Sequence, residues 1–124
     1  MPSKYFKCYT AALALAVQPL SPAHAETIAE LDMMAEVAVD EQKGILFAQD
    51  QASRGEFLEA IGTLERVLAL HPKSSSARLL HAVYLCQIDD QQGGAVEIGK
   101  LKKSSIPDEL WADAHKLCPL AGKE

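Results

Sequence analysis

Apolar residues recur every three or four positions along most of the chain, which is the spacing of one face of an α-helix. The segment from Phe57 to Pro72 shows this most clearly, with apolar side chains at Phe57, Ala60, Ile61, Leu64, Val67 and Leu68. Runs in which apolar and polar residues alternate, the pattern typical of strands, do not occur in the sequence. The pattern therefore predicts an all-α fold.

Six helices are expected, over about residues 27–38, 41–54, 57–71, 76–88, 91–102 and 107–118. Thr27 and Glu30 match a capping box at the start of the first helix. Pro72 ends the third, because proline cannot donate a backbone N–H to the preceding turn. Ser105 is expected to cap the sixth helix and Pro107 to lie in its first turn. The sequence leaves open whether the first two helices are continuous.

Three of these helices have apolar faces that predict how they pack. The fourth is apolar on nearly every side, so we expect it to be buried between its neighbours. The faces expected to be covered in the first and sixth helices consist of Ile28, Leu31, Met34 and Val37, and of Leu110, Trp111, Ala114 and Leu117.

The segment from Met1 to Ala25 has the composition of a secretory signal peptide. Lys4 and Lys7 come first, a short apolar run follows, and Ala23-His24-Ala25 ends the segment with a small-x-small pattern. The apolar run is well below the roughly 20 residues that span a bilayer. We expect cleavage after Ala25 and a mature chain that lies in the periplasm or is secreted. An uncleaved N-terminal anchor is the alternative.

Charge and cysteine content narrow the class of protein. Cleavage after Ala25 removes two lysines and no acid, which changes the net charge from −5 to −7. An acidic exported chain is a poor candidate for binding nucleic acid or anionic lipid. Cys86 and Cys118 remain, and an even number of cysteines in an oxidising compartment favours one disulfide.

The helices recur in pairs with a period of about 34 residues, the length of a tetratricopeptide repeat. If the unit starts at Glu41, Ala48 falls at a small position where two paired helices approach each other. Gly55 then falls in the turn between the helices, and Phe57 at an aromatic position. The residues that fit the repeat by position are Ala48, Gly55, Phe57, Ala60, Leu64, Val67 and Pro72, with Ala82 at the small position of a second unit.

Residues 41–108 therefore resemble two tetratricopeptide repeats. The resemblance implies a short stack of helical hairpins, with an N-terminal helical segment at 26–40 and a capping helix and tail at 109–124. The match is incomplete: Gly94 stands where the family has alanine and Leu101 where it has a small residue, while Gly44 and Phe47 replace its tryptophan and leucine. A helical bundle without repeats is the alternative.

In this family, partners bind the concave face that the first helix of each pair lines. By position, the lining residues here are Gln42, Ile45, Gln49, Ala52, Ser76, Leu79, Val83 and Gln87. The resemblance also implies that Cys86 and Cys118 lie at similar heights on neighbouring helices. It predicts a non-enzymatic module without a cofactor that binds another protein or peptide segment, such as an adaptor or accessory subunit of a cell-envelope assembly.

Few residues indicate any other chemistry. The sequence contains no G-x-S-x-G, H-E-x-x-H or phosphate-binding glycine loop, so we expect no enzyme. His115 and Cys118 share a helix face, and with Cys86 they could bind a metal ion. The alternative function is therefore a small periplasmic metal- or thiol-handling protein. A stress or storage-type exported domain with no defined ligand is a third interpretation.

Overall fold

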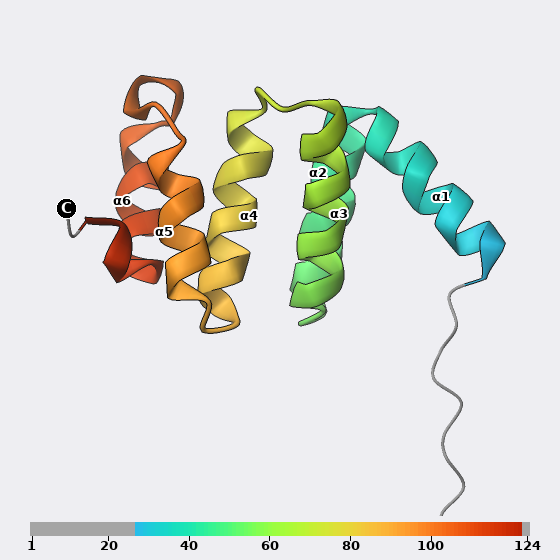
Figure 1. Ribbon diagram of the computed structural model, residues 1–124, viewed down its shortest axis with the longest axis horizontal. Helices are drawn as coiled ribbons and strands as arrows, with labels where there is room; N and C mark the ends of the chain where they lie inside the picture. The colour runs from blue at the N-terminus through green and yellow to red at the C-terminus, as the bar shows by residue number, and fades with distance from the viewer. Residues whose placement is uncertain (1–26, 123–124) are drawn as a thin grey trace, which may run out of the picture.

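The computed structural model describes residues 27–122, whose regular elements are all helical (Figure 1). The α-helices are α1 (Ile28–Val39), α2 (Glu41–Ser53), α3 (Phe57–Leu70), α4 (Ser75–Gln87), α5 (Gln91–Gly99) and α6 (Asp108–Leu117), with 3-10 turns η1 (Lys103–Ser105) and η2 (Pro119–Gly122). The predicted all-α fold is confirmed. The predicted signal peptide lies outside the described residues.

Short polar side chains fix where the first helices begin. Thr27 caps α1 through the predicted capping box with Glu30. Asp40 has an extended backbone and accepts a hydrogen bond from the N–H of Lys43 (3.0 Å), so it ends α1 and caps α2. The first two helices are therefore separate. Ser74 caps α4 in the same way.

The helices pack as adjacent antiparallel pairs, with α2 behind α3 and α6 behind α5 in the view of Figure 1. Helix α4 contacts α2, α3, α5 and α6, which places it at the centre of the molecule. The expectation that the fourth helix is buried between its neighbours is confirmed. Helix α1 packs on α2 and α3, at the end of the molecule away from α5 and α6 (Figure 1).

The core consists of two clusters of buried side chains. The first cluster has side chains from all four helices α1, α2, α3 and α4, around Leu64 and Val67, which are fully buried. The second joins α4, α5 and α6 around the disulfide, with Ile98, Ile106 and Ala114. The small residues Ala48, Ala60 and Ala82 are also fully buried between helices, so a larger side chain there would force helices apart.

The two interhelical turns, from α2 to α3 and from α4 to α5, have the same geometry. Gly55 and Asp89 are the only described residues with a positive φ, at +80° and +67°. In both turns this residue's N–H bonds to the carbonyl three residues earlier, and the next N–H bonds to the carbonyl five residues earlier. This is the Schellman arrangement that ends many helices. The two turns lie one predicted repeat period apart, as do the starts of α2 and α4 and of α3 and α5.

The segment between α5 and α6 differs from the prediction. Helix α5 ends at Gly99 instead of about residue 102, and the Ser105 hydroxyl donates to the carbonyl of Lys102 (2.7 Å) instead of capping α6. Pro107 is the residue that precedes α6 and does not lie in its first turn. Pro107 explains the later start of α6, since a residue before proline is driven out of helical angles and Ile106 is extended.

The terminal helices are covered less than their apolar faces predict. Ile28 is 79% exposed and only Ala38 of α1 is buried, because the N-terminal half of α1 extends away from the body (Figure 1). In α6, Ala114 is buried and Trp111 partly so, whereas Leu110 and Leu117 remain exposed. The apolar faces of α1 and α6 are therefore each only partly covered by the rest of the protein.

Candidate functional site

The predicted binding face consists of residues on α2 and α4, two helices that contact each other directly. Four of its eight residues, Gln42, Gln49, Ser76 and Gln87, are exposed, and two more, Ala52 and Val83, are partly exposed. The last two are not on the surface: Ile45 is 6% and Leu79 is 7% exposed.

Ile45 and Leu79 belong to the two core clusters, so the predicted lining is corrected at both positions. The residue after each one is accessible instead: Leu46 is 55% exposed and Leu80 is partly exposed. One residue along a helix is a rotation of about 100°. The signal for this was present, since each buried residue lies three positions before a packing alanine, Ala48 or Ala82, and shares its face.

The corrected surface, which we call the α2/α4 stripe, has one turn-by-turn row from each helix. Its members are Gln42, Leu46, Gln49 and Ser53 on α2, and Ser76, Leu80, Val83 and Gln87 on α4. Ser53, which is exposed, replaces the predicted Ala52, which packs against the first core cluster. The row on α4 starts one repeat period after the row on α2 and has the same spacing. Only the leucine is the same in both rows, since Ser76, Val83 and Gln87 stand where α2 has Gln42, Gln49 and Ser53.

The stripe combines amide groups with apolar side chains. Gln42, Gln49 and Gln87 make no side-chain hydrogen bond to another described residue, and each offers both donors and an acceptor. Leu46 supplies apolar area beside two of them. Such a surface can bind a peptide backbone through the amides while the leucine is buried by the partner.

A buried polar pair fixes which side of α2 faces outward. The Thr63 hydroxyl on α3 donates to the Gln51 side-chain oxygen on α2 (2.8 Å), and both residues are buried. Losing Thr63 would leave the buried Gln51 side-chain oxygen without a hydrogen bond, whereas the Thr63 hydroxyl also accepts one from Arg66 (3.4 Å). The pair therefore sets the rotation of α2 on α3, and with it the outward direction of Leu46 and Gln49. Sequence periodicity gave no indication of this contact.

An ion pair fixes α5 against α4. Arg78 on α4 and Lys100 after α5 both hydrogen-bond the Glu97 carboxylate, at 2.7 and 2.5 Å, and the Glu97 side chain is 12% exposed. Burial raises the pKa of Glu97, but the hydrogen bonds from Lys100 and Arg78 outweigh it and hold the pKa below its ordinary value of 4.5. Glu97 is therefore held as a carboxylate.

The predicted disulfide between Cys86 and Cys118 is confirmed, with 5.5 Å between the Cα atoms. It joins α4 to the residue that follows α6, inside the second core cluster. Both sulfurs are bonded to each other, so neither is a thiolate that could bind a metal in this state. His115 instead has Nδ1 2.9 Å from the Trp111 carbonyl. Within residues 27–122, no group of three or more metal-ligating side chains comes together.

Comparisons with known proteins do not add a relative. No protein-family model matches the sequence, and no curated protein and no solved structure matches it either. None of the described helices is both long and apolar enough to cross a membrane.

Proposed function

We propose that this chain is a short tetratricopeptide-like stack that acts as a non-enzymatic protein-binding module through the α2/α4 stripe. Its role would be that of an adaptor or accessory subunit of a cell-envelope assembly. The partner would be a helix or an extended segment of another protein, bound roughly in the micromolar range or more weakly, because the stripe offers little area to offset the entropy cost of association.

One observation carries the proposal: the two helix pairs repeat at a constant offset. The Schellman turns at Gly55 and Asp89, the caps at Asp40 and Ser74, and the helix starts all share this offset. It equals the period of tetratricopeptide repeats, whose stacks present the first helix of each pair to partners. The exposed amides and Leu46 lie on those two helices.

The disulfide supports an exported location. Disulfides persist in oxidising compartments and are rare in reducing ones. Together with the signal-peptide composition of residues 1–25, it favours the periplasm or the exterior as the place of action. The metal- or thiol-handling alternative receives no such support, since its two cysteines are used in the bond.

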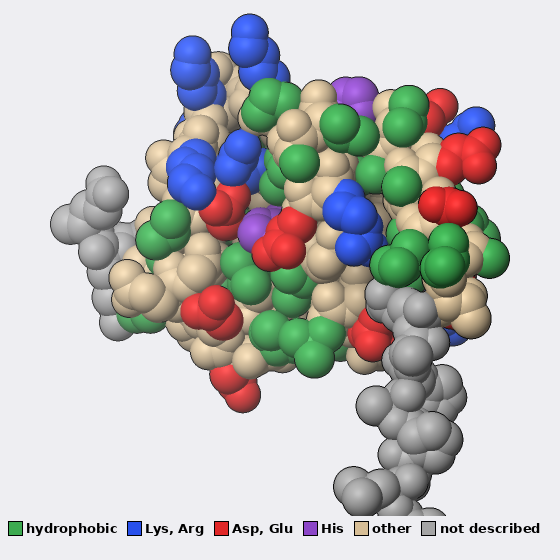
Figure 2. Space-filling view, turned by 45° about the vertical axis from the view of Figure 1, so that its right-hand side comes forward, with side chains coloured by type: hydrophobic (Ala, Val, Ile, Leu, Met, Phe, Trp, Pro, Cys, Tyr) green, Lys and Arg blue, Asp and Glu red, His purple; other side chains and the backbone are tan. Residues whose placement is uncertain are grey.

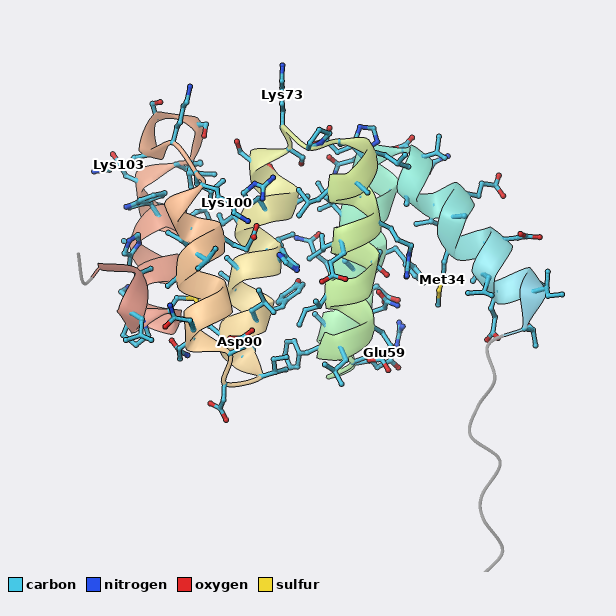
Figure 3. The ribbon with its side chains drawn as sticks, viewed as in Figure 1. Met34, Glu59, Lys73, Asp90, Lys100 and Lys103 are labelled. Carbon is cyan, nitrogen blue, oxygen red and sulfur yellow. A yellow bond between two sulfur atoms is a disulfide. The ribbon has the colours of Figure 1, made fainter. Side chains whose placement is uncertain are left out.

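The test is site-specific photocrosslinking in the native envelope. A photoreactive residue is placed at Gln49 or Gln87 on the stripe, and at Glu59 as a matched control. Glu59 is also an exposed polar residue on a helix, but it lies on α3 beside the groove formed with α1 (Figure 3). We expect both stripe positions to crosslink the same protein and Glu59 not to.

Two results would overturn this assignment. The first is no crosslinked product from either stripe position in cells where the protein is present and oxidised. The second is the same product at equal yield from Gln49, Gln87 and Glu59, because contact on all sides would not be specific to α2 and α4.

A further inference from the structure

Basic side chains gather at one end of this acidic molecule. Lys73 lies in the loop between α3 and α4, Arg78 on α4, and Lys100, Lys102 and Lys103 lie between the end of α5 and η1. Figure 2 shows lysine and arginine side chains at the upper left, and Figure 3 shows Lys73, Lys100 and Lys103 toward the same end. Segments distant in the sequence therefore bring cations together.

All of these side chains except Lys103 line a hollow of about 540 Å³. Its polar lining includes Lys73, Ser75, Arg78, Lys100, Lys102 and Ser105. The Ser75 and Ser105 hydroxyls lie 3.2 Å apart, which connects the start of α4 to η1. We call this hollow the basic end pocket.

The pocket has more positive than negative charge. Glu97 is the carboxylate that pairs with its cations, and it bonds Arg78 and Lys100 together. Arg78 also donates to the Pro72 carbonyl (2.9 Å), so its position is fixed by the fold. Lys73 and Lys102 are exposed and form no ion pair within residues 27–122. Four cations thus line the pocket, against two neighbouring carboxylates: Glu97, and Glu41, which accepts a hydrogen bond from Ser74 at the pocket's edge (2.6 Å).

The excess of positive charge at the pocket contrasts with the negative net charge of the whole chain. The whole chain has a net charge of −5, and no lysine or arginine occurs between residues 27 and 42. A local positive field on an otherwise acidic protein attracts anionic partners to one place and orients them. Random surface lysines would be scattered among the acids instead of lining a hollow.

We propose that the basic end pocket binds an acidic segment of a partner polypeptide, separately from the α2/α4 stripe. The free cations, Lys73 and Lys102, come from different segments and lie around the hollow, which fits carboxylates spaced along a chain. Compact phosphate sites instead focus several donors on one group, and here Arg78 and Lys100 already bind Glu97. A flat anionic membrane would repel the acidic remainder of the molecule.

The test is fluorescence anisotropy of a labelled polyglutamate peptide with the oxidised mature protein at low salt, and a polyglutamine peptide serves as the neutral reference. The site variant is Lys73→Glu/Lys102→Glu. The matched control is Lys43→Glu/Lys116→Glu, which makes the same change of net charge at exposed lysines on α2 and α6. Circular dichroism checks that each variant is folded. If Lys73→Glu/Lys102→Glu does not fold, Lys73→Gln/Lys102→Gln replaces it as the site variant.

We expect the parent to bind polyglutamate and not polyglutamine, with an affinity that falls as salt rises. The site variant should lose about tenfold or more in affinity, and the control less than about twofold. Equal losses in both double variants, or no binding of polyglutamate by the parent, would overturn the proposal. Displacement of the peptide by equimolar inorganic phosphate, or site-dependent binding to phosphatidylglycerol vesicles in place of the peptide, would assign the pocket to those ligands and overturn it too.

Discussion

Gly94 has room for a hydrogen atom and nothing larger. A Cβ at this position would lie 2.1 Å from the Cys86 sulfur and 2.9 Å from the Ala82 carbonyl oxygen. Gly94 occupies the place that Ala60 takes one repeat period earlier, where the helices of the first pair meet. The disulfide fills the space that an alanine methyl would need. This departure from the repeat pattern therefore has a steric cause.

Gly44 differs from the tetratricopeptide pattern that the sequence resembles for a related reason. A Cβ there would lie 2.3 Å from the Val67 methyl and 3.4 Å from the Val37 carbonyl oxygen. Helix α1 packs on α2 and α3 in this region. The large side chain that tetratricopeptide repeats have at this position would collide with Val67 of α3 and crowd the end of α1.

Substitution of Gly94 tests this close packing directly. Gly94→Ala should destabilise the oxidised protein by about 1–3 kcal/mol, because backbone and sulfur atoms cannot both move away. The control is Gly62→Ala, in the middle of α3, where the nearest atom to a new Cβ is 3.8 Å away at the flexible end of Arg66. That change should stabilise by about 0.5–1 kcal/mol through helix propensity. Urea unfolding gives both values, and a Gly94→Ala protein as stable as the parent would contradict the packing.

The Glu97 ion pair predicts how stability depends on pH. The folded-state pKa of Glu97 lies below its value of 4.5 in the unfolded chain, so the unfolded state binds the proton first as pH falls. The stabilisation is fully present above pH 4.5 and is lost as pH falls through the folded pKa. Glu97→Gln should therefore be less stable than the parent at neutral pH and should lose less stability on acidification.

Urea unfolding of both proteins between neutral pH and mildly acidic pH measures this difference. The Asp113→Asn variant is a suitable control, because its carboxylate pairs with Lys116 on the exposed side of α6. Parallel stability curves for the parent and Glu97→Gln would show that the Arg78–Glu97–Lys100 group contributes nothing through its charge.

At the scale of the helices, the sequence predicts well which helices exist and where most of them start. It predicts less well which side of each helix faces its neighbours. The starts of α2, α3 and α5 match the predicted residues, and α4 starts one residue earlier than expected, because Asp40, Gly55, Pro72 and Asp90 act locally on the backbone. The rotation of α2 depends instead on the Gln51–Thr63 contact between two helices. The repeat positions predict Ile45 as a lining residue, and only its place three residues before Ala48, on the same helix face, indicates that Ile45 is buried and Leu46 exposed.

Local sequence signals do not predict where α5 ends or how exposed α1 is. Three glycines weaken α5, which ends at the third of them, Gly99. The apolar face of α1 has the helical period, but a period does not tell whether a neighbour is present to cover it. Ile28 and Leu31 remain exposed for this reason.

The disulfide predicts a stability difference between the two halves of the stack. It closes a loop with a sequence separation of 32 residues, and in the chain-entropy model it contributes about 3–4 kcal/mol. Reduction should lower the free energy of unfolding by about that amount and weaken amide protection first around Ile98, Ile106 and Ala114, which pack on the bond. Hydrogen exchange with and without reductant measures this. Equal loss of protection around Leu64 and Val67 would contradict a local role.

At the scale of the whole molecule, two equivalent pairs place two equivalent rows of residues on neighbouring helices. Helices α2 and α4 contact each other, and α4 is held on both sides by the Phe57–Tyr84 ring contact with α3 and by the Arg78–Glu97 pair with α5. The α4 row of the α2/α4 stripe is thus carried by a helix that is packed on both sides. A rigid surface binds with a smaller ordering cost than a flexible one.

The most direct measurement of the proposed function compares two leucine-to-arginine variants in capture of the crosslinked envelope partner. Leu46 on the α2/α4 stripe is 55% exposed and Leu58 on α3 is 69% exposed, so arginine at either position should leave the fold intact. We expect Leu46→Arg to capture about tenfold less partner than the parent, because a charge would replace the apolar contact, and Leu58→Arg to capture as much as the parent. Equal capture by all three folded proteins would show that the stripe is not the binding site.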